Sequence, residues 1–196
     1  MNFLAHAYLS FDHPQVLAGN MISDFVKGKA QYDFAPLVQA GIKLHRSIDK
    51  YTDDHWATKG AQEIFRPAYR LYSGPIMDVI YDHFLATDPI IFNNHTLRQF
   101  SQKVYATLDT QSFYLPVRFL NMLPYMKAQD WLKNYNTVEG IERSLAGLVR
   151  RSSFMNDHQG AVSLFLEHYE LLRSHYNSFF GDLKQHAAEK FEELVK

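Results

Sequence analysis

Apolar residues recur along this chain at intervals of three and four positions, a spacing that is typical of amphipathic α-helices. Prolines at positions 14, 75 and 89 punctuate the pattern. The pattern predicts helices over residues 2–10, 15–26, 36–54, 58–72, 75–87, 97–108, 128–135, 138–150 and 161–194. Residues 112–124 have mixed character, and no segment alternates convincingly like a half-buried strand. The sequence therefore predicts an all-α protein, a single-domain helical bundle spanning residues 1–196.

The last predicted helix is the longest, and its apolar positions form one stripe. That stripe consists of Phe165, Leu166, Tyr169, Leu172, Tyr176, Phe179, Phe180, Leu183 and Phe191. A stripe at helical spacing is characteristic of packing against a core rather than of a cofactor site. We therefore expect residues 91–196 to supply supporting helices, including this long C-terminal helix.

The composition favours a folded protein and excludes several kinds of chemistry. Hydrophobic residues make up 46% of the 196 residues and aromatic residues 15%, which is enough for a buried core. The formal net charge of −1 lacks the basic excess of a nucleic-acid-binding protein. Without cysteine, disulfides, thiolate zinc sites and cysteine nucleophiles are excluded. No signal peptide or stretch of about 20 apolar residues is present, so we expect a cytoplasmic protein without a membrane segment.

Histidine and aspartate recur at helical spacing within residues 36–54. His45, Asp49 and Asp53 are four residues apart and therefore lie along one face of the predicted helix. An imidazole and a carboxylate at this spacing can bind one divalent cation together, or one can orient the other. The alternative is a solvated pair on a helix surface, which is common.

The helix predicted from residue 75 repeats the theme in more apolar surroundings. Asp78 and Asp82 are again four residues apart, and His83 follows directly. Two carboxylates on an apolar helix need a compensating cation. That cation is either a metal ion or an arginine, for which Arg46, Arg66 and Arg70 are the alternatives.

Two further candidates lie upstream. His6 falls within an apolar segment, where a satisfied core histidine is the alternative to a ligand, and Asp24 is either a ligand or a helix cap. Together the candidates fall on four successive predicted helices, and a bundle can direct such ligands into one pocket. Nitrogen and oxygen ligands without sulfur suit Mn²⁺, Mg²⁺ or Fe²⁺. We therefore expect residues 1–90 to form the metal-site helices.

At these residues the chain resembles the acyl carrier protein phosphodiesterases, also called holo-acyl-carrier-protein hydrolases. The matching motifs follow one another in order over roughly the first 90 residues. They are residues 2–6 (NFLAH), 19–28 (GNMISDFVKG), 41–49 (GIKLHRSID), 52–55 (TDDH) and 78–85 (DVIYDHFL). The resemblance implies an all-helical fold related to the HD-type phosphohydrolases, with Mn²⁺ as the favoured metal.

The same resemblance implies an activity and a set of site residues. The activity is removal of the 4′-phosphopantetheine arm from holo-acyl carrier protein, which would connect the chain to fatty acid biosynthesis. The implied metal ligands are His6, Asp24, His45, Asp82 and His83. Asp49 and Asp78 are expected to complete the shell or accept a proton, Arg46 to contact phosphate, and Asp53 to lie nearby.

An acidic carrier protein would need a locally basic docking face despite the near-neutral total charge. The candidates for that face are Arg143, Arg150, Arg151, Arg173, Lys27 and Lys29. Each of them has solvated surface charge as its alternative. Two other functions stay open at this point: an HD-type phosphohydrolase acting on a nucleotide, and a non-catalytic helical binding module with a structural metal or ion pairs.

Overall fold

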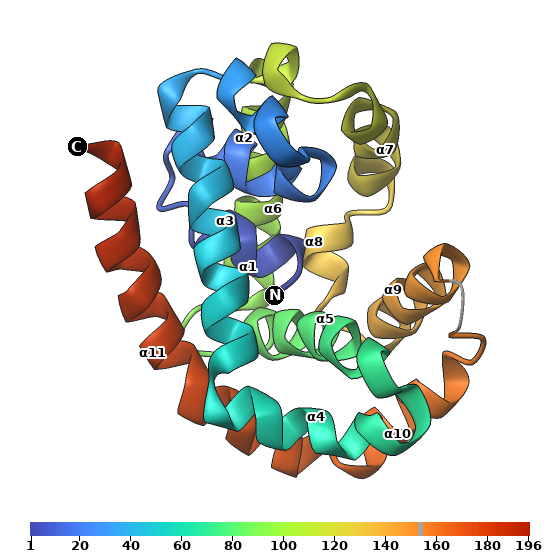
Figure 1. The fold of residues 1–196 in the computed structure, drawn as a ribbon. Helices are drawn as coiled ribbons and strands as arrows, with labels where there is room; N and C mark the ends of the chain where they lie inside the picture. Colours follow the sequence, from blue (N-terminus) through green and yellow to red (C-terminus); the bar gives the residue numbers. More distant parts are fainter. Residues whose placement is uncertain (153–154) are drawn as a thin grey trace.

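The computed structural model describes residues 1–152 and 155–196, and all of its regular elements over those ranges are helical (Figure 1). The all-α prediction is therefore confirmed. In chain order the helices are α1 (Phe3–Tyr8), α2 (Pro14–Ile22), α3 (Pro36–Asp54), α4 (Trp56–Tyr69), α5 (Ser73–Ala86), α6 (Asn94–Thr110), α7 (Val117–Ala128), α8 (Trp131–Asn134), α9 (Val138–Arg151), α10 (Gln159–Glu167) and α11 (Tyr169–Val195). Short 3₁₀ turns lie at Ser23–Phe25, Gly28–Asp33, Arg70–Tyr72 and Ser112–Tyr114.

The helix predicted over residues 161–194 is two helices, which is a correction to the sequence interpretation. The chain breaks at His168, whose ψ of 20° departs from helical geometry between α10 and α11. Within α10, Phe165 of the predicted stripe is buried, whereas its neighbour Leu166 is half exposed. The break gives α10 and α11 separate directions, and α11 then runs along α3 and α4 (Figure 1).

The region between residues 112 and 135 also differs from expectation. Pro124 lies inside α7 rather than ending a helix. Asp130 adopts a left-handed conformation with φ of 43°, which separates α7 from the four-residue helix α8. The helix predicted over residues 128–135 is therefore shorter than its apolar pattern indicates.

The core centres on α5 and is covered by helices from both halves of the chain. Ile76, Ile80 and Phe84 of α5 are fully buried. Buried side chains from α1 to α11 join α5 in one connected cluster. Over the described ranges, no helix combines the length and the apolar character that crossing a bilayer requires.

Helices α2 and α3 approach each other more closely than most helix pairs, because glycines face each other at their crossing. A Cβ atom added to Gly19 would collide with the carbonyl oxygen of Val38, and one on Gly41 would collide with the carbonyl oxygen of Val16. Glycine is therefore required at both positions. This close crossing brings the backbone of α2 within reach of His45 on α3.

Candidate metal centre

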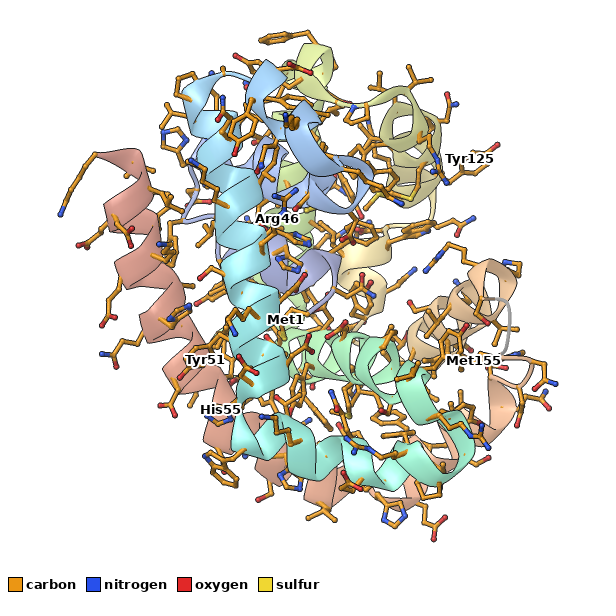
Figure 2. The ribbon with its side chains drawn as sticks, viewed as in Figure 1. Met1, Arg46, Tyr51, His55, Tyr125 and Met155 are labelled. Atoms are coloured by element: carbon orange, nitrogen blue, oxygen red, sulfur yellow. The ribbon has the colours of Figure 1, made fainter. Side chains whose placement is uncertain are left out.

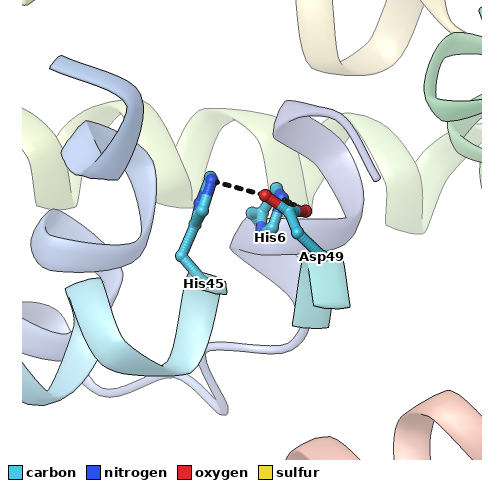
Figure 3. Close-up of side chains that lie close together, drawn as sticks. All are labelled: His6, His45 and Asp49. Carbon is cyan, nitrogen blue, oxygen red and sulfur yellow. Dashed lines mark ion pairs between the residues drawn. The ribbon is translucent and has the colours of Figure 1, made fainter. Parts of the chain in front are cut away.

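Three of the predicted site residues lie close together (Figure 3). His6 comes from α1, and His45 and Asp49 come from successive turns of α3. The Nε2 atom of His6 lies 3.1 Å from Oδ1 of Asp49, and Nε2 of His45 lies 3.1 Å from Oδ2 of the same carboxylate. One ligand atom from each residue lies within 4.8 Å of the others, which is a spacing that suits a shared metal ion.

The backbone of α2 fixes the orientation of His45. Its Nδ1 atom lies 2.7 Å from the carbonyl oxygen of Asn20, so Nδ1 carries a proton and Nε2 is the ring nitrogen directed at the site. The Asn20 amide donates to the carbonyl oxygen of His6 at 2.9 Å and to Oγ of Ser10 at 3.0 Å. Asn20 therefore ties α1 and α3 together through α2 and sets the relative positions of both histidines.

The polar atoms of this group fit a metal ion better than they fit one another. The imidazoles of His6 and His45 stack with ring centroids 3.8 Å apart at an angle of 12°, so neither ring points edge-on at the other. Nε2 of each histidine and Oδ1 of Asp49 are buried without a partner of hydrogen-bond geometry among the described residues. Buried polar atoms without partners are costly. A bound cation would satisfy all three atoms at once.

The charges of the group follow from burial, from the carboxylate of Asp49 and from the nearby carboxylate of Asp24. Burial and the neighbouring His45 lower the pKa of His6 to about 4. Burial also opposes charge on His45, but the carboxylates of Asp24 and Asp49 outweigh it and raise the pKa of His45 to about 9. Burial works against charge on Asp49 as well, yet the two histidines hold the pKa of Asp49 well below its usual range. Without a metal ion, His45 is thus the charged imidazole and His6 the neutral one.

Asp24 reaches the group from its solvent side. It lies in the 3₁₀ turn after α2, its side chain is 76% exposed, and its Oδ1 atom is 3.4 Å from Nε2 of His45. The nearby imidazole of His45 outweighs burial and lowers the pKa of Asp24. Asp24 is therefore ionised and adjacent to the three-residue group without being one of its members.

Asp78 is paired with an ammonium group rather than with an arginine. The amino group of Met1 lies 2.7 Å from Oδ1 of Asp78 and 3.5 Å from Oδ1 of Asp49. Burial opposes the charge of this amino group, but the two carboxylates raise its pKa to about 11. Burial raises the pKa of Asp78 to about 6. Figure 2 shows Met1 beside α3, on the same side of the molecule as Arg46.

The side chains of Asp82 and His83 form hydrogen bonds with groups outside the cluster of His6, His45 and Asp49. Asp82 is fully buried and accepts hydrogen bonds from the backbone N–H groups of Leu4 at 2.7 Å, Asn2 at 3.2 Å and Ala5 at 3.3 Å, so it caps the N-terminus of α1. Burial raises the pKa of Asp82 to about 7.

His83 lies on a different face of α5. Its Nδ1 atom lies 2.8 Å from the carbonyl oxygen of Tyr135, and its Nε2 atom lies 3.1 Å from the hydroxyl of Tyr169. Burial lowers the pKa of His83. Asp82 and His83 are adjacent in sequence, but neither joins the group of His6, His45 and Asp49.

Arg46 does not lie in the site; its side chain is hydrogen-bonded to the segment that follows Asp24. Its guanidinium donates to Oε1 of Gln31 at 2.7 Å and to the carbonyl oxygen of Val26 at 3.1 Å. Over the described ranges, neither Asp78 nor Asp82 forms an ion pair with Arg46, Arg66 or Arg70, so the arginine alternative is not realised.

A cavity of about 610 Å³ adjoins the candidate metal centre. Its lining includes three acidic residues, Asp49, Asp53 and Asp78, and two basic ones, Arg66 and Arg70. The sequence interpretation weighed these two arginines only as partners of Asp78 and Asp82. It also missed the position of Asn20, although an amide between Gly19 and Met21 on an apolar helix is itself a sign of a buried polar contact.

The fold and the site thus define an all-helical protein with a possible metal-binding group of two histidines and one aspartate. Comparison with known proteins is more specific: residues 1–183 match the family described as acyl carrier protein phosphodiesterase. The chain belongs to this family. No solved structure matches the chain, so the relation to HD-type phosphohydrolases stays a prediction.

Curated relatives cover the chain almost from end to end. A Yersinia pestis protein named acyl carrier protein phosphodiesterase is 32% identical over 97% of this chain and 99% of its own length. A Klebsiella pneumoniae protein of the same name is 31% identical, and an Escherichia coli one is 30% identical, each with the same coverage. The match therefore extends into the second half of the chain, where the sequence motifs are sparse.

Proposed function

We propose that this chain hydrolyses the phosphodiester of holo-acyl carrier protein, releasing 4′-phosphopantetheine and the apo protein, and that the reaction depends on Mn²⁺. The family supplies the reaction. The observation that carries the metal dependence is the buried group of His6, His45 and Asp49, whose converging atoms have no hydrogen-bond partners over the described ranges.

Nε2 of His6, Nε2 of His45 and the Asp49 carboxylate would hold the metal, and exposed Asp24 could add a fourth ligand. These nitrogen and oxygen donors suit Mn²⁺, Mg²⁺ and Fe²⁺, and the family resemblance favours Mn²⁺. When bound, such an ion supplies Lewis-acid stabilisation of phosphate charge and a more acidic water. Asp82 and His83, which we expected to be ligands, instead position α1 and α5 in this proposal.

Asp78 is our candidate for the group that accepts a proton from the attacking water. Its side chain lines the cavity and is 32% exposed, so water reaches it. A pKa of about 6 makes its carboxylate a competent base near neutral pH. The amino group of Met1 holds the carboxylate in place from the protein side.

The carrier protein would dock on the basic face of α9. Arg143, Arg150 and Arg151 line a groove of about 220 Å³ together with Phe3 and Trp131. Phe3 is on α1, one turn before His6, so α1 contributes a residue to the groove and another to the candidate metal centre. Arginines around such a groove favour an acidic partner.

The other predicted docking residues fall elsewhere. Arg173 donates to the hydroxyl of Tyr169 at 2.7 Å and to Oγ1 of Thr87 at 3.0 Å, so we remove it from the docking face. Lys27 and Lys29 are exposed but do not line the groove.

The test is the mass of a holo-acyl carrier protein after incubation with this chain and Mn²⁺, beside a chelator control. Asp49→Asn removes a proposed ligand charge, and Asp54→Asn, an exposed position five residues along α3, is the matched control. We expect loss of the phosphopantetheine mass with the wild type and Asp54→Asn only. Hydrolysis of nucleotides but not of the carrier protein would replace the substrate assignment, and no hydrolysis at all would leave a binding module.

A further inference from the structure

The cavity beside the metal centre is lined by both acidic and basic side chains. Asp49 and Asp78 face it from α3 and α5, and Arg66 and Arg70 face it from the end of α4 and the turn that follows. Helices α4 and α5 lie next to each other near the lower end of α3 in Figure 1, so these lining residues come from neighbouring elements. A volume of about 610 Å³ lies within the usual range for small-molecule sites.

The two arginines are available to a ligand. Arg66 lies 3.3 Å from Glu63, but both side chains are more than half exposed, and such pairs exchange readily. Arg70 forms no ion pair with an acid over residues 1–152 and 155–196. Its backbone has a φ of 49° and a ψ of −116°, a conformation that non-glycine residues rarely adopt. The fold thus holds Arg70 at the cavity in spite of a backbone cost.

We infer that this cavity binds the phosphopantetheine part of the substrate and the released 4′-phosphopantetheine, with Arg66 and Arg70 on the phosphate oxygens. This inference rests on the proposed function. The three carboxylates that line the cavity repel an anion, so a phosphate can enter only where cations face the same space. Guanidinium groups meet that need because their paired N–H groups match phosphate oxygens.

The rest of the lining suits the arm itself. A pantetheine arm carries amide groups and a branched apolar segment. Gln62 offers an amide that can both donate and accept, while Leu71 and Pro75 offer apolar contact. The arm would therefore extend along α4 and the Arg70–Tyr72 turn.

The bond changes explain why the arginines would act on the product side. Water adds its oxygen to phosphorus and the bond from phosphorus to the serine oxygen of the carrier breaks. One proton of the water goes to the serine oxygen, and the other is released to solvent when the monoester ionises. The phosphate therefore stays with the arm, and its charge rises from one to two as the diester becomes a monoester. Arg66 and Arg70 would hold that added charge, so they act as binding residues with greater effect on product than on substrate.

The experiment measures binding of 4′-phosphopantetheine and of pantetheine, which lacks the phosphate, to the full chain loaded with Mn²⁺. The variants are Arg66→Gln, Arg70→Gln and the double variant. Lys59→Gln is the control, because Lys59 is an exposed cation on the same helix that does not line the cavity. We expect the double variant to bind 4′-phosphopantetheine at least about tenfold more weakly, with pantetheine binding unchanged and helical circular dichroism retained.

Hydrolysis of holo-acyl carrier protein is measured on the same proteins, which separates the two proposals. Hydrolysis by the wild type, with unchanged 4′-phosphopantetheine binding in the double variant, overturns the cavity assignment and leaves the proposed function standing. Arginine-dependent binding of 4′-phosphopantetheine without hydrolysis supports the cavity and overturns the proposed function. Equal weakening of pantetheine and 4′-phosphopantetheine would show that the arginines shape the cavity without contacting phosphate, and so would also overturn the assignment.

Discussion

Replacing His45 by glutamine should make stability of the metal-free protein less dependent on pH. In the folded protein the carboxylates of Asp24 and Asp49 hold the pKa of His45 at about 9, above its ordinary value of 6.5. Folding therefore favours the protonated imidazole. The resulting stabilisation is fully present below pH 6.5 and is lost as the pH rises through 9.

The size of the effect follows from that interval. Each pH unit of difference corresponds to about 1.4 kcal/mol, so the interval gives about 3 kcal/mol. Asp24 is 76% exposed and Asp49 is 38% exposed, and solvent around them weakens the pairing. We therefore expect the free energy of unfolding of the wild type to fall between pH 6 and pH 10 by about 2 kcal/mol more than that of His45→Gln.

Urea unfolding followed by circular dichroism, with chelator present, measures this difference. The free energy of unfolding of the wild type and of His45→Gln is compared at pH 6, 8 and 10, and the gap between them should narrow as the pH rises. The lost stacking on His6 contributes to the gap at every pH and so does not affect its slope. A gap that stays constant from pH 6 to pH 10 would show that His45 is not protonated in the metal-free fold and would refute the reasoning.

Three further predictions follow from single contacts. Asp82→Ala should lower the free energy of unfolding by about 3 kcal/mol, because three backbone N–H groups lose their acceptor; urea unfolding measures this, and a loss below 1 kcal/mol would contradict the capping role. Gly41→Ala should destabilise the protein by about 2 kcal/mol, because its methyl group collides with backbone atoms of α2. Gly181→Ala, whose methyl group enters open space, should stabilise the protein by about 0.5 kcal/mol. Equal thermal unfolding midpoints for these two variants would contradict the close α2–α3 crossing. Replacing Arg150 and Arg151 together with glutamate should raise KM for holo-acyl carrier protein much more than it lowers kcat, and an unchanged KM would remove the groove as the docking face.

Helical periodicity was enough to predict the fold class and most helix positions. The group of His6, His45 and Asp49 was also within reach of the sequence, because two of its members are four residues apart on one helix. The break at His168 was not, since the apolar stripe continues across it with no proline or glycine to mark the end of α10. Only the direction that α11 must take along α3 distinguishes one helix from two.

The contacts of Asp82 and His83 could not be predicted from the sequence. The family resemblance implied that both of them bind metal. Their partners in the structure are main-chain groups of α1 and of Tyr135, together with the hydroxyl of Tyr169. Main-chain N–H and C=O groups occur at nearly every residue, so a sequence carries no mark of which one will meet a buried carboxylate or imidazole.

The central claim is that His6, His45 and Asp49 hold the metal on which turnover depends. The most direct test titrates metal-free protein with Mn²⁺ and measures bound Mn²⁺ by electron paramagnetic resonance and hydrolysis of holo-acyl carrier protein on the same samples. We predict that turnover rises in proportion to bound Mn²⁺, and that Asp49→Asn loses both while Asp54→Asn keeps both. Turnover that persists in chelator, or Mn²⁺ binding that survives in Asp49→Asn, would contradict the account.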